Sequence, residues 1–269
     1  MFAEMCVLAM TGVGSMVGVT ENEPALAASP GFHFVEVEGV GGPVKGAIYI
    51  PWSMPDDEGG APALVFLHGY GECGTEGTHQ LGVGLPNVLI WNPERWPFVV
   101  VIPQKPEFNA DWDDYEDAVL AMLDLAIADY GVDADRVALT GLSQGGHGTI
   151  ALASHHPDRF RAAAPVCGYT AQRFVDGDRR ELPPVTAESP AVVAAAEALA
   201  GTPVWIFHGG ADDVVPPAES ESLHAALVAA GNDDAKLTIF PNANHNAWDP
   251  AYRGDHALWS WLFEQTEAE

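Results

Sequence analysis

The stretch "RVALTGLSQGGHGTIALAS", residues 136–154, decides which fold to expect. An apolar run ends at Gly141, Ser143 stands in the pattern G-x-S-x-G, and a helical run follows at once. Glycine loses more backbone entropy on folding than other residues, so glycines on both sides of one serine need a reason. A sharp strand-to-helix turn supplies one, because it holds the serine hydroxyl out for reaction. The stretch therefore predicts such a turn with Ser143 as a nucleophile, and an ordinary structural turn is the alternative.

Seven further short apolar runs accompany this one along the chain: "FHFVEVEG" from Phe32, "VKGAIYIP" from Val44, "ALVFLHG" from Ala63, "FVVVIPQ" from Phe98, "RAAAPVCG" from Arg161, "VWIFHG" from Val204 and "KLTIFP" from Lys236. The first two alternate apolar and polar residues, as half-exposed antiparallel strands do, whereas the later runs are continuous, as in covered parallel strands. Helical patterns separate the later runs, which favours an α/β protein. We expect one domain at 31–269, with a mostly parallel eight-stranded sheet, helices on both faces and no large lid.

The composition limits the partners. Asp and Glu number 38 against 11 for Lys and Arg, for a net charge of −27. Such a surface repels nucleic acid and anionic membranes, so neither is expected as a partner. Adaptation to high salt is the favoured interpretation of this charge, and an ordinary acidic surface is the alternative. Residues 1–30 form an apolar stretch without a basic start, either an N-terminal extension or a degenerate signal segment, so cytoplasmic and secreted locations both stay open.

The chain has three cysteines, Cys6, Cys73 and Cys167, and no Cys/His cluster with zinc-ligand spacing. In the usual strand order of such a sheet, one strand lies between the strand before Cys73 and the strand before Cys167. The two outer strands are therefore about 10 Å apart. A disulfide needs Cα atoms within about 7 Å. We therefore expect free thiols and no metal site.

Seven histidines follow Ser143 and are candidates for its base. Most lie in helical patterns, and His208 ends the run "VWIF", where a buried histidine bonded to the backbone is expected. His245 differs, because it lies in the loop "PNANHNAW" beyond the last strand, at the sheet edge where such folds bind ligands. His245 is therefore the predicted base. The acid that orients it should come from "HGGADDVVPP", which offers Asp212 and Asp213.

A serine nucleophile also needs amide donors for the oxyanion. The amide of Gln144, directly after the nucleophile, is one predicted donor. The other should come from "LHGYGECGTEG", the glycine-rich loop after the third strand, where Tyr70 is the expected donor. His68 and Glu72 are expected to brace this loop.

The segments "LHGYGE", "PQKPEFNADW", "GLSQGGHG", "HGGADDVVPP" and "NANHNAWDPAY" occur in this order. Together they resemble α/β-hydrolase esterases of the dienelactone-hydrolase and feruloyl-esterase-like group, which includes chains often labelled predicted peptidases. The resemblance covers Phe32 to Phe263. It implies that Asp212, in the pattern H-G-x-x-D, is the acid, and that Trp112 and Trp248 lie near the site and bind the substrate. One departure is that dienelactone hydrolases use a cysteine nucleophile, whereas this chain carries serine.

These residues predict a serine hydrolase that cleaves small carboxylic esters, with short-chain or aromatic acyl groups, through an acyl-enzyme and without a cofactor. A peptidase or amidase with the same triad is one alternative. A non-catalytic binding module is another, but such a chain should have lost a triad member. Tyr70 and Phe174 are expected to add to an aromatic wall. The cluster Arg173, Arg179 and Arg180 suits local charge pairing or a carboxylate-bearing substrate, and pairing is favoured.

Overall fold

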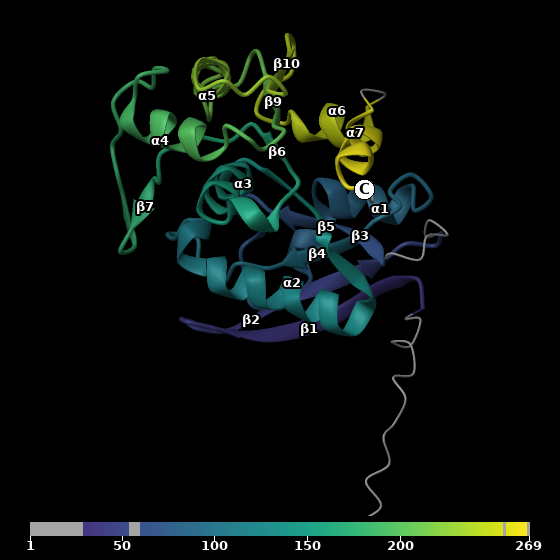
Figure 1. Cartoon of the computed structure of the whole chain (residues 1–269). Helices are drawn as coiled ribbons and strands as arrows, with labels where there is room; N and C mark the ends of the chain where they lie inside the picture. The colour runs from purple at the N-terminus through teal and green to yellow at the C-terminus, as the bar shows by residue number, and fades with distance from the viewer. Residues whose placement is uncertain (1–28, 54–59, 255–256, 268–269) are drawn as a thin grey trace, which may run out of the picture.

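The computed structural model describes residues 29–53, 60–254 and 257–267. An eight-stranded sheet runs through it in the order β1-β2-β4-β3-β5-β6-β9-β10 (Figure 1). The strands are β1 (Gly31–Gly39), β2 (Gly42–Ile50), β3 (Ala61–Leu67), β4 (Val99–Pro103), β5 (Val132–Leu142), β6 (Ala162–Val166), β9 (Trp205–Gly209) and β10 (Lys236–Phe240). These are the eight runs predicted from the sequence, although β5 begins before the predicted start at Arg136.

Strand direction follows the residue pattern. β2 pairs antiparallel with both β1 and β4, and the pairs from β4 to β10 are parallel. The helices are α1 (Leu85–Trp91), α2 (Glu116–Tyr130), α3 (Gln144–His155), α4 (Pro190–Ala198), α5 (Ala218–Ala229), α6 (Trp248–Arg253) and α7 (Leu258–Gln265), with 3-10 turns at Tyr70–Glu72, His79–Gly82, Trp112–Tyr115 and Pro157–Arg159. The chain thus alternates strand and helix after β3, as parallel crossovers require.

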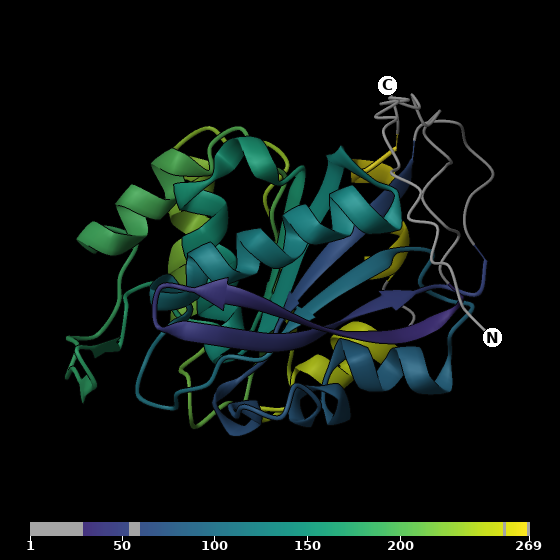
Figure 2. The ribbon, with the colours of Figure 1, turned by 90° about the horizontal axis from the view of Figure 1, so that it is seen from below.

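Helices cover both faces of the sheet. In Figure 2 the teal α2 and α3 lie on one side, and the blue α1 and yellow α6 lie on the other. Along β3, Val65 and Leu67 pack into the core beneath α2 and α3, while Leu64 and Phe66 pack into the core with α1, α6 and α7. Because both faces are covered, alternate side chains are equally buried, which explains the continuous apolar run in the sequence.

Between β6 and β9 the chain builds a small hairpin that the sequence analysis did not predict. Its strands are β7 (Phe174–Val175) and β8 (Asp178–Arg179). Both turn residues, Asp176 and Gly177, have positive φ, at 53° and 82°. Asp-Gly is a strong signal for such a turn, so "FVDGDRR" did carry the information. Within the described ranges, this hairpin and α4 are the only regular elements between β6 and β9, and no large lid is present there.

This is the α/β-hydrolase fold that the sequence predicts. The expected N-terminal segment and Cys6 lie outside the described residues. The strand order places β5 between β3 and β6, and Cys73 and Cys167 are free and buried, as expected. In the part of the chain described, no helix combines the length and apolar character that crossing a membrane needs.

Candidate active site

Ser143 lies in a strained turn between β5 and α3. Its backbone has φ 54° and ψ −115°, which a residue with a side chain seldom adopts. The flanking glycines are required by contact: a Cβ on Gly145 would lie 2.0 Å from the carbonyl oxygen of Leu67, and one on Gly141 would lie 2.3 Å from that of Gly145. Positions 141 and 145 therefore have no room for a side chain, and Ser143 between them remains partly exposed at the carboxyl edge of the sheet.

His245 joins Ser143 to Asp212. The Nδ1 atom of His245 lies 2.7 Å from Asp212 Oδ2, and its Nε2 atom lies 2.9 Å from Ser143 Oγ. Because Nδ1 faces a carboxylate, it carries the proton, and Nε2 is left to accept the hydroxyl hydrogen of Ser143. The structure therefore brings together the three residues that the sequence analysis named from separate loops after β5, β9 and β10.

The turn after β9 holds the Asp212 side chain in a buried position. Its Oδ1 accepts hydrogen bonds from the amides of Val214 and Val215, at 2.9 and 3.0 Å. Its Oδ2 also lies 3.2 Å from Nε2 of His208, which donates to the Val215 carbonyl at 2.9 Å. Burial lowers the pKa of His208, so it stays neutral in this position. Asp213 is exposed and lies outside this network. Of the two neighbouring aspartates, the buried Asp212 is therefore the one that bonds His245.

The loop after β3 is braced as expected. His68 donates from Nδ1 to the Gly69 carbonyl at 2.6 Å and accepts the Lys105 amide at Nε2 at 2.9 Å. Burial lowers the pKa of His68 to about 3, so the ring is neutral. Glu72 accepts the Gly69 amide at 3.0 Å. Tyr70, which lies between these two braced positions, lines the cavity that contains Ser143.

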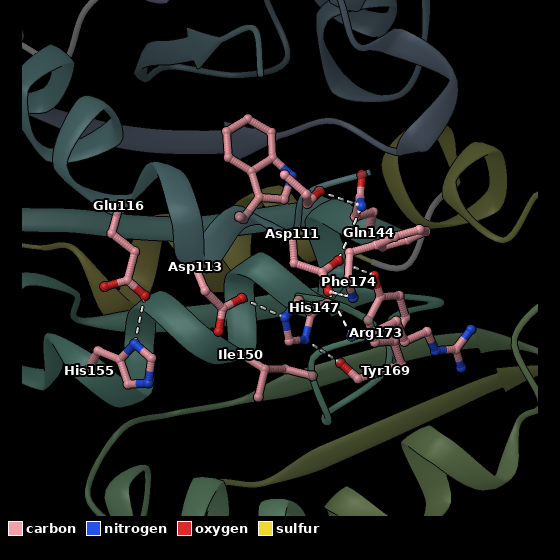
Figure 3. A network of polar contacts seen from close by, with 12 residues as sticks. Asp111, Asp113, Glu116, Gln144, His147, Ile150, His155, Tyr169, Arg173 and Phe174 are labelled. Carbon is pink, nitrogen blue, oxygen red and sulfur yellow. Dashed lines mark hydrogen bonds and ion pairs between the residues drawn. The ribbon is translucent and has the colours of Figure 1, made fainter. Parts of the chain in front are cut away.

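Asp111 anchors Gln144, and the sequence analysis did not single it out. This carboxylate is fully buried and accepts four hydrogen bonds (Figure 3). Its Oδ1 accepts from Gln144 Nε2 at 3.1 Å and from the Tyr169 hydroxyl at 2.5 Å. Its Oδ2 accepts from the backbone amides of Arg173 and Phe174 at 2.6 and 2.8 Å. Four donors thus converge on one carboxylate. One of them belongs to the residue after Ser143, and two belong to the base of the β7–β8 hairpin.

A second pair, between the buried His147 and the partly buried Asp113, packs against Tyr169 of this network. His147 Nε2 lies 2.7 Å from Asp113 Oδ1, and the His147 ring stacks on Tyr169 with centroids 4.7 Å apart. Burial alone lowers the pKa of His147, but the hydrogen bond and charge of Asp113 outweigh it, so the pKa is raised. Burial likewise opposes the Asp113 anion, yet His147 holds the pKa of Asp113 below its usual value. His147 is therefore committed to this pair and does not serve Ser143.

A cavity of about 660 Å³ opens over Ser143. The aromatic residues that line it are Tyr70, Tyr169, Phe174 and Trp248, and the rings of Tyr70 and Phe174 stack with centroids 6.1 Å apart. Trp248 also meets the His245 ring edge-on at 5.5 Å. The expectation that Trp112 contacts the substrate is wrong. Its side chain is fully buried in the core, and its indole nitrogen donates to the His68 carbonyl at 3.1 Å, so it supports the loop from behind.

Cys167, Asp212 and His245 place potential metal ligands within 4.8 Å of one another. Metal binding would require the thiolate of Cys167, but burial raises the pKa of this thiol strongly. Asp212 and His245 are in turn hydrogen-bonded to each other. The donor set therefore fits a proton-relaying triad better than a metal site.

Similar proteins include several esterases. The chain is 30% identical to feruloyl esterase B of Neurospora crassa, over 43% of this chain and 42% of that protein. It is 23% identical to acetylxylan esterase A of Talaromyces purpureogenus, over 82% of this chain and 65% of that protein. The crystal structure of a thermostable esterase matches with a TM-score of 0.67 and 26% identity, over 88% of this chain and 63% of that one. The chain thus spans less than two thirds of the length of these relatives.

The expected resemblance to feruloyl-esterase-like α/β-hydrolases is confirmed by these matches. The model of the prolyl oligopeptidase family matches residues 107–268, which is more than half of the chain and includes Ser143, Asp212 and His245. The chain belongs to the prolyl oligopeptidase family.

Proposed function

We propose that the protein hydrolyses carboxylic esters through an acyl-enzyme intermediate on Ser143. The observation that carries the proposal is the continuous hydrogen-bond path from Ser143 Oγ through His245 to Asp212, at 2.9 and 2.7 Å, on the floor of an open cavity. Ser143 attacks the ester carbonyl while His245 Nε2 takes its proton. His245 then returns the proton to the departing alcohol, and a water molecule releases the acid by the same steps.

The negative charge of the tetrahedral intermediate would rest on the backbone amides of Tyr70 and Gln144. Both residues line the cavity beside Ser143, and Gln144 is the first residue of α3, whose N-terminus favours negative charge. Asp111 supports this role, because it holds the Gln144 side chain and thereby the first turn of α3.

The substrate class we infer is an ester with a short or aromatic acyl group. Four Tyr, Phe and Trp residues line the cavity: Tyr70, Tyr169, Phe174 and Trp248. The names of the relatives point the same way, since feruloyl and acetyl esters are aromatic and short, respectively.

A pair of substrates that differ only in the scissile bond tests the reaction type. The 4-nitrophenyl ester and the 4-nitroanilide of butyric acid share the acyl group, and N-acetyl-Ala-Ala 4-nitroanilide adds a peptide. We expect turnover of the ester and none of the two anilides, because an anilide needs stronger protonation of a poorer leaving group. A value of kcat/KM for the peptide anilide equal to that for the ester would assign the protein as a peptidase instead.

A further inference from the structure

Arg179 and Arg180 differ from every other basic residue of this acidic protein. The chain has 11 Lys and Arg against 38 Asp and Glu. Four of the basic side chains form ion pairs with carboxylates: Lys45, Arg159, Arg173 and Arg253. Five others bind backbone carbonyls or lie over aromatic rings: Arg95, Lys105, Arg136, Arg161 and Lys236. Within the described ranges, only the guanidinium groups of Arg179 and Arg180 have no such partner. The favoured prediction of local pairing therefore fits Arg173 and not these two.

The hairpin places Arg179 over the active site. Phe174 and Arg179 are directly paired across β7 and β8, so their side chains share one face. Both line the cavity that contains Ser143 and His245. Arg180 is the next residue, and it lines two neighbouring hollows but not this cavity. One unpaired cation therefore faces the reaction site, and its neighbour of equal charge does not.

The hairpin base is fixed to the buried network of Figure 3. Asp111 accepts the amides of Arg173 and Phe174, and the Arg180 amide donates to the Arg173 carbonyl at 2.7 Å. Arg173 itself is neutralised by Glu219 at 3.2 Å and stacks on Tyr169 at 4.1 Å. These contacts hold both ends of the hairpin, so Arg179 is presented from an anchored support even though its own side chain is exposed.

The charge of the protein around this cavity indicates which class of substrate Arg179 would bind. A net charge of −27 repels an anionic substrate from most of the surface, so a local cation at the cavity decides whether such a substrate can bind. A guanidinium matches a carboxylate through two parallel hydrogen bonds. We propose that Arg179 binds a carboxylate of the substrate, so that the preferred esters carry a carboxylate away from the scissile bond and an apolar or aromatic portion against Tyr70, Phe174 and Trp248. This inference rests on the proposed ester hydrolysis.

Two matched substrate pairs test it, one for each side of the scissile bond. On the acyl side, mono(4-nitrophenyl) adipate and 4-nitrophenyl hexanoate have six-carbon acyl chains and differ in a terminal carboxylate. On the alcohol side, caffeoylquinate and caffeoylquinamide share the acyl group and the quinic ring, and they differ in whether the ring carries a carboxylate or a neutral amide. The measured quantity is the ratio of kcat/KM, charged over neutral, for the wild type, Arg179→Gln and the matched control Arg180→Gln.

We expect Arg179→Gln to lower this ratio about tenfold in at least one pair, since a hydrogen-bonded charge contributes on the order of 1.4 kcal/mol at a partly exposed site. Arg180→Gln, which lies outside the cavity, should keep the wild-type ratio and should hydrolyse the neutral esters within about twofold of the wild type. An unchanged ratio in both pairs, or an equal fall in both variants, would overturn the subsite. Absence of hydrolysis of all four esters by the wild type would instead contradict the proposed function, and the subsite with it.

Discussion

Asp212 and Asp213 are chemically identical neighbours with opposite surroundings. Asp212 is buried and accepts two backbone amides and His245, whereas Asp213 is exposed. We expect Asp212→Asn to lower kcat by about three to four orders of magnitude, because the amide no longer fixes the His245 tautomer or stabilises the imidazolium. Asp213→Asn is the matched control and should keep kcat within about twofold of the wild type. Equal losses in the two variants would show that the turn matters and Asp212 does not.

His68 makes the stability of the protein depend on pH. Its folded pKa of about 3 lies below the unfolded value of about 6.5, so the unfolded chain takes up the proton first as the pH falls. Stability from His68 is therefore complete above pH 6.5 and is lost progressively below it, by about 2–3 kcal/mol at pH 4.5. Urea unfolding above pH 6.5 and at pH 4.5 measures this loss of unfolding free energy. The loss should be smaller for His68→Asn, whose side chain retains a donor to the Gly69 carbonyl. Identical losses in variant and wild type would refute this assignment.

At the scale of single residues, candidate site residues could be predicted from the sequence where few residue types can perform the required chemistry. Ser143 and His245 follow from a motif and from loop position, and the preference for Asp212 comes from the H-G-x-x-D pattern. Trp112 shows the limit. A tryptophan beside the site can face the substrate or the core, and only packing distinguishes them: here its indole donates to the His68 carbonyl.

At the scale of elements, Asp111 joins α3 to the β7–β8 hairpin. All four of its partners are donors, so the amide hydrogens of an asparagine would oppose some of them. We expect Asp111→Asn to lower the free energy of unfolding by about 3 kcal/mol and to reduce kcat for a neutral ester, because Gln144 loses its anchor. Tyr169→Phe, which removes one donor, should cost about 1 kcal/mol. Denaturant unfolding and initial rates check both variants, and wild-type stability of Asp111→Asn would refute the anchoring role.

The strands of the main sheet could be predicted because continuous and alternating apolar runs distinguish covered from half-exposed strands. The β7–β8 hairpin was missed because each of its strands has two residues, too few for a periodic pattern. Asp111 was missed for a different reason. Its role depends on donors at Gln144, Tyr169 and Arg173, which lie 33, 58 and 62 residues from Asp111 along the chain and reach it only in the folded protein.

For the whole molecule, the net charge of −27 should oppose folding at low ionic strength. Salt screens repulsion between exposed charges beyond about 10 Å at 0.1 M. We therefore expect Tm to rise by several degrees when NaCl increases from 10 mM to 1 M, with the steepest rise at the low end. Differential scanning calorimetry at constant pH measures this. A Tm that stays level or falls over the low-salt range would show that the carboxylates are already compensated by the fold.

The central claim is that Ser143 is the nucleophile of a hydrolase, and active-site labelling tests it most directly. A fluorophosphonate reacts with a serine only when a neighbouring base activates the hydroxyl and the amides bind the resulting anion. Intact-mass measurement followed by peptide mapping should find one phosphonyl group, on Ser143, in the wild type. Ser143→Ala should remain unlabelled and inactive while keeping the wild-type Tm. Labelling of another residue, or ester turnover at the wild-type rate by Ser143→Ala, would contradict the account.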